Sequence, residues 1–323
     1  MLGKMMRAAM LSALAIVSVS IPALAQEKYP SKEIHFICGF PPGSGADIMV
    51  RFFADKIGKK TGNVIVVDNR PGAGGILALT TTARAAPDGH TILVSGGTAA
   101  AINANLLKAP PIDIGKDIRA VATINQIPFV VAVDPKSPYK SLPELTEALR
   151  KKGNKGSYAF ATPFAKVIAE SYKTEAGLQT VEVSYKGSID SLNDLASGAV
   201  DFAVYDPTMA LAQQREGRLR LLAVSSPERF RPTGDIPTFR EYGINIDMLG
   251  WWAAMVPAKT PDNIAQTINR WFGDALADPE TAAFLIKSGA DVLVMSPEKT
   301  HAYFLEDIKN WARLVEMARI EKQ

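Results

Sequence analysis

Short apolar runs alternate with segments of helical spacing along the chain, and this alternation restricts the fold more than any other feature. Residues 33–40, 63–68 and 91–95 have the apolar, extended pattern of buried strands. Residues 48–62 and 76–85 lie between them and have helical spacing. Strand, helix and strand at this spacing predict βαβ units, in which helices cover both faces of a parallel sheet.

A second series of alternating elements follows and predicts a second α/β unit. It starts with a strand at 121–133 and a helix that Ser141 caps, with Pro143 in the first turn and Glu144 completing a capping box. The remaining predicted elements are strands at 156–160, 180–184, 202–205, 219–224, 248–256 and 291–295, and helices at 163–176, 188–197, 208–216, 261–277, 279–289 and 297–320.

We expect the chain to cross between the two units twice. A length of 323 residues suggests roughly two domains, and the last helices need a sheet to cover, so the C-terminal stretch should return to the first unit. The predicted fold class is α/β with two lobes, each a mostly parallel sheet flanked by helices. Residues 26–124 and 253–323 form lobe I, and residues 125–252 form lobe II. A cleft between two such lobes suits a small ligand.

The first 25 residues have the composition of a secretory signal peptide. Lys4 and Arg7 precede an apolar run at 8–19. The small residues Ala23 and Ala25 follow this run, which predicts export and cleavage after Ala25. A membrane anchor is the alternative, but the run is short for a bilayer span.

Charge and residue content exclude several classes of function. The leader carries two basic residues and no acidic one, so its removal lowers the net charge from +3 to +1. Such a chain has no long-range field for nucleic acid or an anionic membrane. The single cysteine, Cys38, lies in the first predicted strand and is expected to be a buried thiol. His35, His90 and His301 lack metal-ligand spacing, and we expect no metal and no cofactor.

The loop after the first strand carries the strongest functional signal. It reads FPPGSGAD from Phe40 to Asp47, a glycine-rich turn between a strand and a helix. Such a turn presents backbone N–H groups at the positive end of a helix dipole, where a carboxylate can bind. Gly43 and Gly45 allow the backbone to approach a ligand closely. The alternative is a tight turn in which Ser44 or Asp47 caps an ordinary helix.

Two enzyme motifs can be compared with this loop. The nucleophile elbow G-x-S-x-G fails because neither flanking glycine is present around Ser44. The dinucleotide fingerprint G-x-G-x-x-G fails at its third glycine, which Ile48 replaces, although Asp68 follows about 20 residues on as that motif requires. Export also argues against a nicotinamide cofactor, which is not freely available outside the cytoplasm.

A series of further motifs runs through nearly the whole mature chain. They are YPSK at 29–32, FPPG at 40–43, ADI at 46–48, DNRPGAGG at 68–75, APDGHT at 86–91, YKGS at 185–188, LASGAVD at 195–201, DIPT at 235–238 and ADPE at 277–280. With these motifs in this order, the chain resembles the extracytoplasmic solute receptors of the tripartite tricarboxylate transporter family, the Bug proteins. The motif at 68–75 is the most specific of them.

The resemblance implies a periplasmic binding protein fold, a ligand in the cleft, closure of the lobes, and delivery to a permease of one large and one small subunit. It also implies that backbone N–H groups and ordered waters hold a ligand carboxylate, with Gly43, Ser44, Gly45 and Ala46 as expected donors. Carried over position by position, the expected ligand-binding residues are Phe40, Pro41, Gly43, Ser44, Gly45, Ala46 and Asp47; Ser95, Gly97 and Thr98; Tyr185, Lys186 and Gly187; and Thr162 and Asp206.

Three features leave alternatives open. Asp206 either accepts a hydrogen bond from an amine or hydroxyl of the ligand or from a water, or is a cap at the end of the strand, before Pro207. The motif at 68–75 is interpreted as a structural turn in preference to a surface that the permease contacts. The loop after the strand at 156–160 is shorter than in the family and lacks its histidine. If Phe160 and Phe164 face the cleft, an aromatic or apolar carboxylate is expected, and otherwise both belong to the core.

The sequence therefore predicts a periplasmic receptor that captures a small carboxylate, does no covalent chemistry and supplies a tripartite tricarboxylate transporter. We expect a monomer whose partners are the carboxylate and the permease subunits. Two alternatives stay open, a receptor that presents the same ligand to a sensor protein and an exported enzyme that uses the same cleft. The enzyme would need a positioned acid, base or nucleophile, and the motifs do not assemble one.

Overall fold

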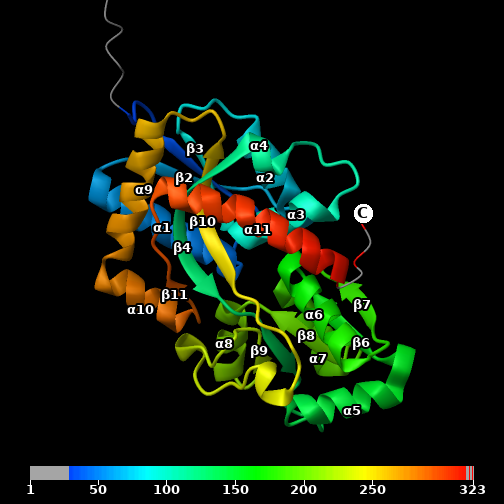
Figure 1. The fold of residues 1–323 in the computed structure, drawn as a ribbon. Helices are drawn as coiled ribbons and strands as arrows, with labels where there is room; N and C mark the ends of the chain where they lie inside the picture. Colours follow the sequence, from blue (N-terminus) through cyan, green and yellow to red (C-terminus); the bar gives the residue numbers. More distant parts are fainter. Residues whose placement is uncertain (1–28, 318–319, 321, 323) are drawn as a thin grey trace, which may run out of the picture.

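Two sheets, each flanked by helices, divide the protein into two lobes (Figure 1). The computed structural model describes residues 29–317, 320 and 322. The predicted signal peptide at residues 1–25 lies outside the described residues. Within the described part of the chain, no helix combines the length and the apolar composition that a bilayer span requires.

The larger lobe contains a six-stranded sheet in the order β11-β4-β10-β3-β1-β2. β1 pairs in parallel with β2 and β3, whereas β10 and β11 pair antiparallel with their neighbours. The strands are Ile34–Cys38 (β1), Ile65–Asn69 (β2), Thr91–Gly96 (β3), Ile118–Ile127 (β4), Gly250–Pro257 (β10) and Asp291–Val292 (β11). The helices are α1 (Gly45–Thr61), α2 (Ile76–Ala83), α3 (Gly97–Leu106), α4 (Ile114–Asp117), α9 (Asp262–Leu276), α10 (Pro279–Lys287) and α11 (Pro297–Met317), and a 3-10 turn, η1, covers Ala73–Gly75.

The smaller lobe contains a five-stranded sheet in the order β7-β6-β8-β5-β9. β6 pairs in parallel with β7 and β8, whereas β5 pairs antiparallel with β8 and β9. The strands are Val130–Val133 (β5), Ser157–Phe160 (β6), Val181–Ser184 (β7), Phe202–Tyr205 (β8) and Arg220–Val224 (β9). The helices are α5 (Leu142–Lys152), α6 (Pro163–Ala176), α7 (Leu192–Ser197) and α8 (Pro207–Arg215), with 3-10 turns η2 (Gly153–Lys155), η3 (Ser188–Ser191), η4 (Arg231–Thr233) and η5 (Arg240–Tyr242).

The two-lobed α/β fold is confirmed, but both sheets are mixed rather than mostly parallel. The reason lies in the crossings between the lobes. β1, β3, β6 and β8 all end toward the other lobe, whereas the chain enters each lobe from that side. The strand that it forms on entry, β5 in the smaller lobe and β10 in the larger, must therefore run against its neighbours.

The first crossing also corrects the strand predicted at 121–133. β4 ends at Ile127 in one sheet and β5 begins at Val130 in the other. Pro128 lies between them and has no N–H to contribute to a ladder. Residues 125–127 and 250–252, which the sequence assigns to lobe II, pair with each other within the larger sheet.

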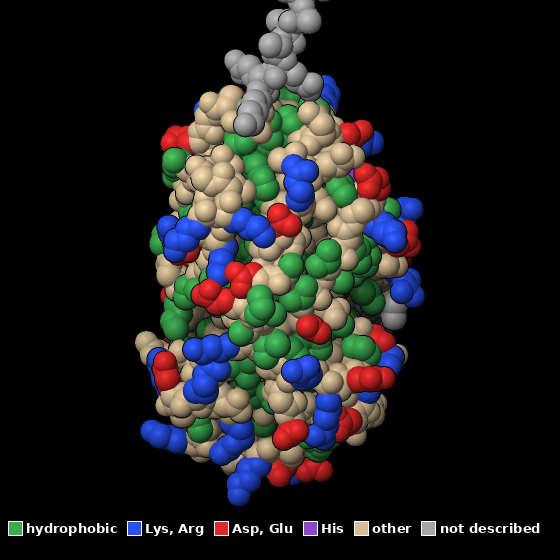
Figure 2. Space-filling view, turned by 90° about the vertical axis from the view of Figure 1, so that its left-hand side faces the viewer, with side chains coloured by type: hydrophobic (Ala, Val, Ile, Leu, Met, Phe, Trp, Pro, Cys, Tyr) green, Lys and Arg blue, Asp and Glu red, His purple; other side chains and the backbone are tan. Residues whose placement is uncertain are grey.

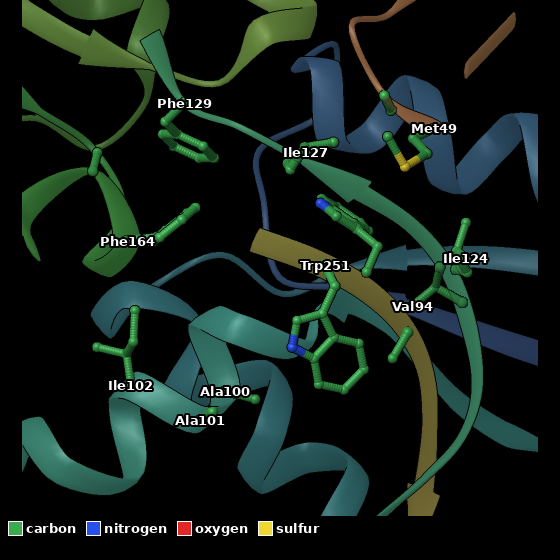
Figure 3. Packing of buried hydrophobic residues seen from close by; sticks show 14 of the residues in the cluster. Met49, Val94, Ala100, Ala101, Ile102, Ile124, Ile127, Phe129, Phe164 and Trp251 are labelled. Carbon is green, nitrogen blue, oxygen red and sulfur yellow. The ribbon is translucent and has the colours of Figure 1, made fainter. Parts of the chain in front are cut away.

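Helix α3 has no counterpart among the elements predicted from the sequence. It follows β3 directly and packs against β10. A Cβ placed on Gly97 would lie 2.5 Å from the Trp251 ring, so this helix can start here only with glycine. The small buried residues Ala100 and Ala101 continue the same close face toward Trp251 (Figure 3).

The hydrophobic core runs continuously from one lobe into the other. Figure 3 shows Phe129 and Phe164 facing each other at the junction, and their ring centroids are 4.8 Å apart. Phe164 also meets the ring of Trp311 on α11, at 5.4 Å. Phe164 is therefore a core residue, whereas Phe160 is half-buried with the ammonium group of Lys166 over its ring.

Replacing Asp307 by asparagine is expected to stabilise the protein at neutral pH. Its carboxylate accepts a hydrogen bond of 2.7 Å from Trp251 Nε1. Burial raises the pKa of Asp307 to about 6, against a hydrogen bond from Trp251 that lowers it. A folded-state pKa above the unfolded one means that the folded state binds the proton more tightly, so stability falls as pH rises from about 4 to about 6.

Asparagine keeps an acceptor for Trp251 and carries no charge. We expect Asp307→Asn to raise the free energy of unfolding by about 1–2 kcal/mol at pH 7.5. At pH 4.5 the gain should be much smaller, because wild-type Asp307 is then mostly protonated. Urea unfolding at the two pH values measures both gains, with Asp55→Asn on the surface of α1 as the control. An equal gain at both pH values would contradict the assignment.

Candidate ligand-binding site

The loops that follow β1, β3, β6 and β8 all lie where the two lobes meet. A Cβ placed on Gly45 would lie 3.3 Å from Thr208 Cγ2 and 3.6 Å from Asp206 Oδ1. On the other side, a Cβ on Gly74 would lie 3.4 Å from Pro163 Cγ. The expected residues of the first loop and Asp206 are thus brought together from opposite lobes. In α/β proteins the carboxyl ends of parallel strands are the usual place for a ligand.

The carboxylate of Asp47 organises the loop between β1 and α1. Its side chain is 4% exposed. Oδ2 accepts hydrogen bonds from the Gly43 N–H, at 2.8 Å, and from Arg51 Nε, at 2.9 Å. Oδ1 accepts a third, from Asn69 Nδ2, at 2.8 Å. Burial raises the pKa of Asp47, but the hydrogen bonds from Arg51, Asn69 and Gly43 outweigh it and lower the pKa overall, so this side chain is a charged brace within the loop.

Ser44 caps α1, and its position decides which N–H groups of the loop remain available. Its hydroxyl donates to the Pro41 carbonyl, at 2.8 Å, and accepts from the Asp47 N–H, at 3.2 Å. The Ser44 N–H donates to the same Pro41 carbonyl. Two of the four expected donors, at Gly43 and Ser44, are therefore used inside the loop. The N–H groups of Gly45 and Ala46 have no hydrogen-bond partner among the described residues, as expected in the first turn of a helix.

The motif at 68–75 supports this loop through hydrogen bonds of Asn69, as expected of a structural turn. Asn69 Nδ2 also donates to the Phe40 carbonyl, at 3.0 Å, and its Oδ1 accepts from Arg51, at 2.9 Å. Beyond it, Gly72, Gly74 and Gly75 have φ values of 140°, 61° and 99°, which L side chains rarely adopt. Sequence reasoning left Asn69 out of the site. Its bonds to Phe40 and Asp47 make it the side chain that joins this motif to the candidate loop.

A small cavity lies beside this turn. Its lining includes Phe40, Gly75 and Ser95, all close to the ends of β1 and β3, and Asn103 from α3. The space has room for about one water molecule. The Asn103 amide donates to the Gly74 carbonyl, at 2.9 Å, which fixes the turn against α3. None of the described residues that line the cavity is Lys or Arg, so its polarity comes from backbone, hydroxyl and amide groups.

Thr98 and Thr162 are each committed to a structural hydrogen bond. Thr98 is 2% exposed, and its Oγ1 accepts from the Trp251 N–H at 2.9 Å, which ties α3 to β10. Thr162 caps α6, and its Oγ1 accepts from the Ala165 N–H at 3.2 Å. Their roles as ligand donors stay predictions. Each hydroxyl already accepts one hydrogen bond, so its O–H group and one lone pair remain for a ligand.

Asp206 lies between the end of β8 and the start of α8, and its side chain caps that helix. Its Oδ1 accepts from the Met209 N–H at 3.0 Å. Burial raises the pKa of Asp206, against the backbone hydrogen bonds that lower it. The carboxylate lies at the positive end of α8 and beside Gly45. A contact between Asp206 and a ligand stays a prediction.

Tyr185, Lys186 and Gly187 follow β7, the edge strand of the smaller sheet. The Tyr185 hydroxyl donates to Asp194 Oδ2 at 2.6 Å, and burial together with Asp194 raises the pKa of Tyr185 to about 12. Lys186 is exposed, and the Gly187 N–H donates to Asp190 Oδ2 at 3.0 Å. Among the described residues, no hydrogen bond or ion pair joins these three residues to the larger lobe, so their place in the site is less direct than that of Gly45 and Asp206.

The chemistry of the junction is that of an anion site without a reactive group. α1 and α8 direct their N-termini toward it from opposite lobes, and α6 begins beside Gly74. Cys38 is buried, and burial raises its pKa to about 11, so it is no nucleophile at neutral pH. Within the residues that the structure describes, no group of three or more His, Cys, Asp or Glu side chains gathers as a metal site would.

Comparison with known sequences identifies relatives over most of the chain. The family model described as the tripartite tricarboxylate transporter family receptor matches residues 49–320. The protein BugT of Bordetella pertussis is 30% identical over 308 residues, which cover 94% of this chain and 94% of BugT.

Solved structures agree with this assignment. Rpa4515 of R. palustris, solved with adipate, has a TM-score of 0.86 and 25% identity, and the match covers 91% of this chain and 99% of that one. The periplasmic binding protein BugD has a TM-score of 0.85 and 27% identity, with 91% and 100% covered. MatC of Rhodopseudomonas palustris, solved with malate, has a TM-score of 0.81 and 25% identity, with 89% and 100% covered.

The family model describes a receptor, and BugD is described as a periplasmic binding protein. The resemblance inferred from the motifs is confirmed, and with it the absence of a catalytic role. The chain belongs to the tripartite tricarboxylate transporter family receptors, the solute-binding Bug proteins.

Proposed function

We propose that this receptor works in the periplasm as a monomer, binds a small carboxylate between its lobes and delivers it to the permease subunits of a tripartite tricarboxylate transporter. The observation that carries the proposal is the meeting of helix N-termini from both lobes around Gly45. The first turns of α1 and α8 lie against each other there. Such a site favours negative charge through oriented N–H groups and helix dipoles.

The ligand class follows from the donors on each side. Gly45 and Ala46 offer two adjacent N–H groups, which match the two oxygens of one carboxylate. Ser95 and Asn103 offer a hydroxyl and an amide near the neighbouring cavity. The relatives solved with adipate and malate hold dicarboxylates, which supports a second acidic group at the far end of the ligand. We therefore favour an aliphatic dicarboxylate over an aromatic acid, and the burial of Phe164 in the core supports the same choice.

Selective stabilisation by acids tests this proposal. The mature chain, from Gln26 to Gln323, is heated with aliphatic di- and tricarboxylates, amino acids and aromatic acids, each paired with its amide. A ligand that binds only the folded state adds about 2.7 kcal/mol at 100 times its Kd, so a true ligand gives a clear rise in Tm. We expect the largest rise with an aliphatic dicarboxylate and none with its amide.

A ligand retained through purification would hide this effect. The panel is therefore repeated after unfolding, dialysis and refolding. A rise with amides as large as with acids would contradict carboxylate recognition. No rise with any acid after refolding would contradict the proposed ligand class.

A further inference from the structure

A second contact between the lobes lies outside the candidate cavity, where α8 of the smaller lobe rests on the turn between α10 and β11 of the larger one. Figure 1 shows α8 directly below α10 and β11. Thr208 Oγ1 donates to the Ser288 carbonyl at 3.1 Å. The next residue, Gly289, has a φ of 76°, and a Cβ placed on it would lie 2.5 Å from Pro207 Cβ and 2.8 Å from Leu211 Cδ1.

The two lobes are in close contact here, and the surface around the contact carries side chains of every kind. On the face that carries α1, α8 and α10, acidic and basic side chains are interspersed, and hydrophobic side chains gather across its middle (Figure 2). None of Pro207, Thr208, Ser288 and Gly289 is among the residues that line the cavity. A contact of this kind between separate lobes forms when the lobes are together and is lost when they part.

We infer that Thr208 and Gly289 form a closure latch that sets how long a ligand is held. The inference rests on the proposed function. A receptor that binds ligand tightly only when closed has an apparent Kd that rises as the closed fraction falls. Any group that separates α8 from the α10–β11 turn should therefore weaken binding, and should do so mainly by raising the dissociation rate.

Gly289→Ala is the variant that tests the latch. The added Cβ collides with Pro207 and Leu211 in the closed arrangement and should raise the Kd about tenfold. Alanine at a φ of 76° also strains the backbone in either arrangement. Gly198→Ala is the matched control, because Gly198 has the same φ of 76° at the end of α7 and has open space where its Cβ would go.

Thr208→Val separates the hydrogen bond from the packing. Valine keeps the shape of threonine but cannot donate to the Ser288 carbonyl. We expect it to raise the Kd severalfold, less than Gly289→Ala does, because one neutral hydrogen bond contributes less than a steric collision.

Lobe separation is measured directly with a pair of spin labels. Lys59→Cys on α1 and Lys151→Cys on α5 place the labels on exposed positions of opposite lobes, and the native Cys38 is buried. Distance distributions are recorded for the wild type, Gly289→Ala and Gly198→Ala, each alone and with malate or adipate. Stopped-flow displacement gives the dissociation rates.

Longer distances and faster release in Gly289→Ala, but not in Gly198→Ala, would support the latch. Unchanged distances in Gly289→Ala, or the same lengthening in both variants, would overturn it. If neither acid binds the wild type, the proposed ligand class is wrong. The distances without ligand still decide the latch in that case, because the collision at Gly289 does not depend on the ligand.

Discussion

Replacing Gly45 by proline is expected to weaken carboxylate binding by about 10- to 100-fold while the protein stays folded. Gly45 is the first residue of α1, where proline is well tolerated because its missing N–H has no partner in the helix. The preceding residue, Ser44, has φ −69° and ψ 161°, a conformation that proline allows. The substitution therefore removes one donor to a charged oxygen and leaves the cap of the helix in place.

Gly45→Ala separates the loss of the N–H from the added bulk. Both variants place a Cβ 3.3 Å from Thr208 Cγ2, but alanine keeps the N–H. We expect isothermal titration to give a Kd for Gly45→Ala within severalfold of the wild type and a much higher one for Gly45→Pro. Equal Kd values for the two variants would mean that the Gly45 N–H does not hold the ligand.

Replacing Trp251 by alanine is expected to cost about 3–5 kcal/mol of the free energy of unfolding. The side chain is 1% exposed and lies against Gly97 at the start of α3. Its ring centroid is 5.0 Å from that of Tyr303 and 6.2 Å from that of Phe304, both on α11. The indole thus fills the space between β10, α3 and α11. Its removal leaves a large cavity and takes the hydrogen-bond donor away from Asp307.

Urea unfolding followed by far-UV circular dichroism measures the loss. Trp251→Phe should recover much of it, because phenylalanine refills most of the volume but cannot donate to Asp307. Adding Asp307→Asn to Trp251→Ala should recover a smaller part, because the half-buried carboxylate no longer needs its donor. A loss below about 1 kcal/mol for Trp251→Ala would show that this junction is not tightly packed.

The local pattern of the chain was enough to predict most elements and the family. Buried strands are recognisable as short apolar runs, and the cap Ser44 marks where α1 begins. Ser141 also stands at the N-cap of α5, but its side chain makes no capping hydrogen bond, and Glu144 accepts from the Lys140 N–H, so the predicted capping box is wrong. Helix α3 was not predicted, because its small residues, beginning at Gly97, have no amphipathic pattern. Its helical state depends on a fit against Trp251, which lies 154 positions further along the chain.

For the candidate site too, the sequence predicted one part and the tertiary structure decided the other. The glycine-rich loop at 40–47 could be identified as an anion-binding turn from its order of residues alone. The sequence could not show which of its N–H groups remain free. Asp47 accepts a hydrogen bond from the Gly43 N–H, and Arg51 and Asn69, both outside the loop, hold the Asp47 carboxylate in place. A hydroxyl in a binding motif such as Thr98 is equally ambiguous, since its partner Trp251 comes from a distant strand.

The sequence by itself determined the two-lobed α/β fold and the family, and it predicted a carboxylate ligand, since these inferences follow from the period of apolar residues and from motifs of a few neighbouring positions. Only the tertiary structure decided the direction of the strands that enter each lobe, the helix at Gly97, and the contacts of Gly45 and Gly289 with α8. Each of these depends on atoms that are far apart in sequence and a few ångströms apart in space. Their fit is a property of packing, which a pattern of residue types along the chain does not contain.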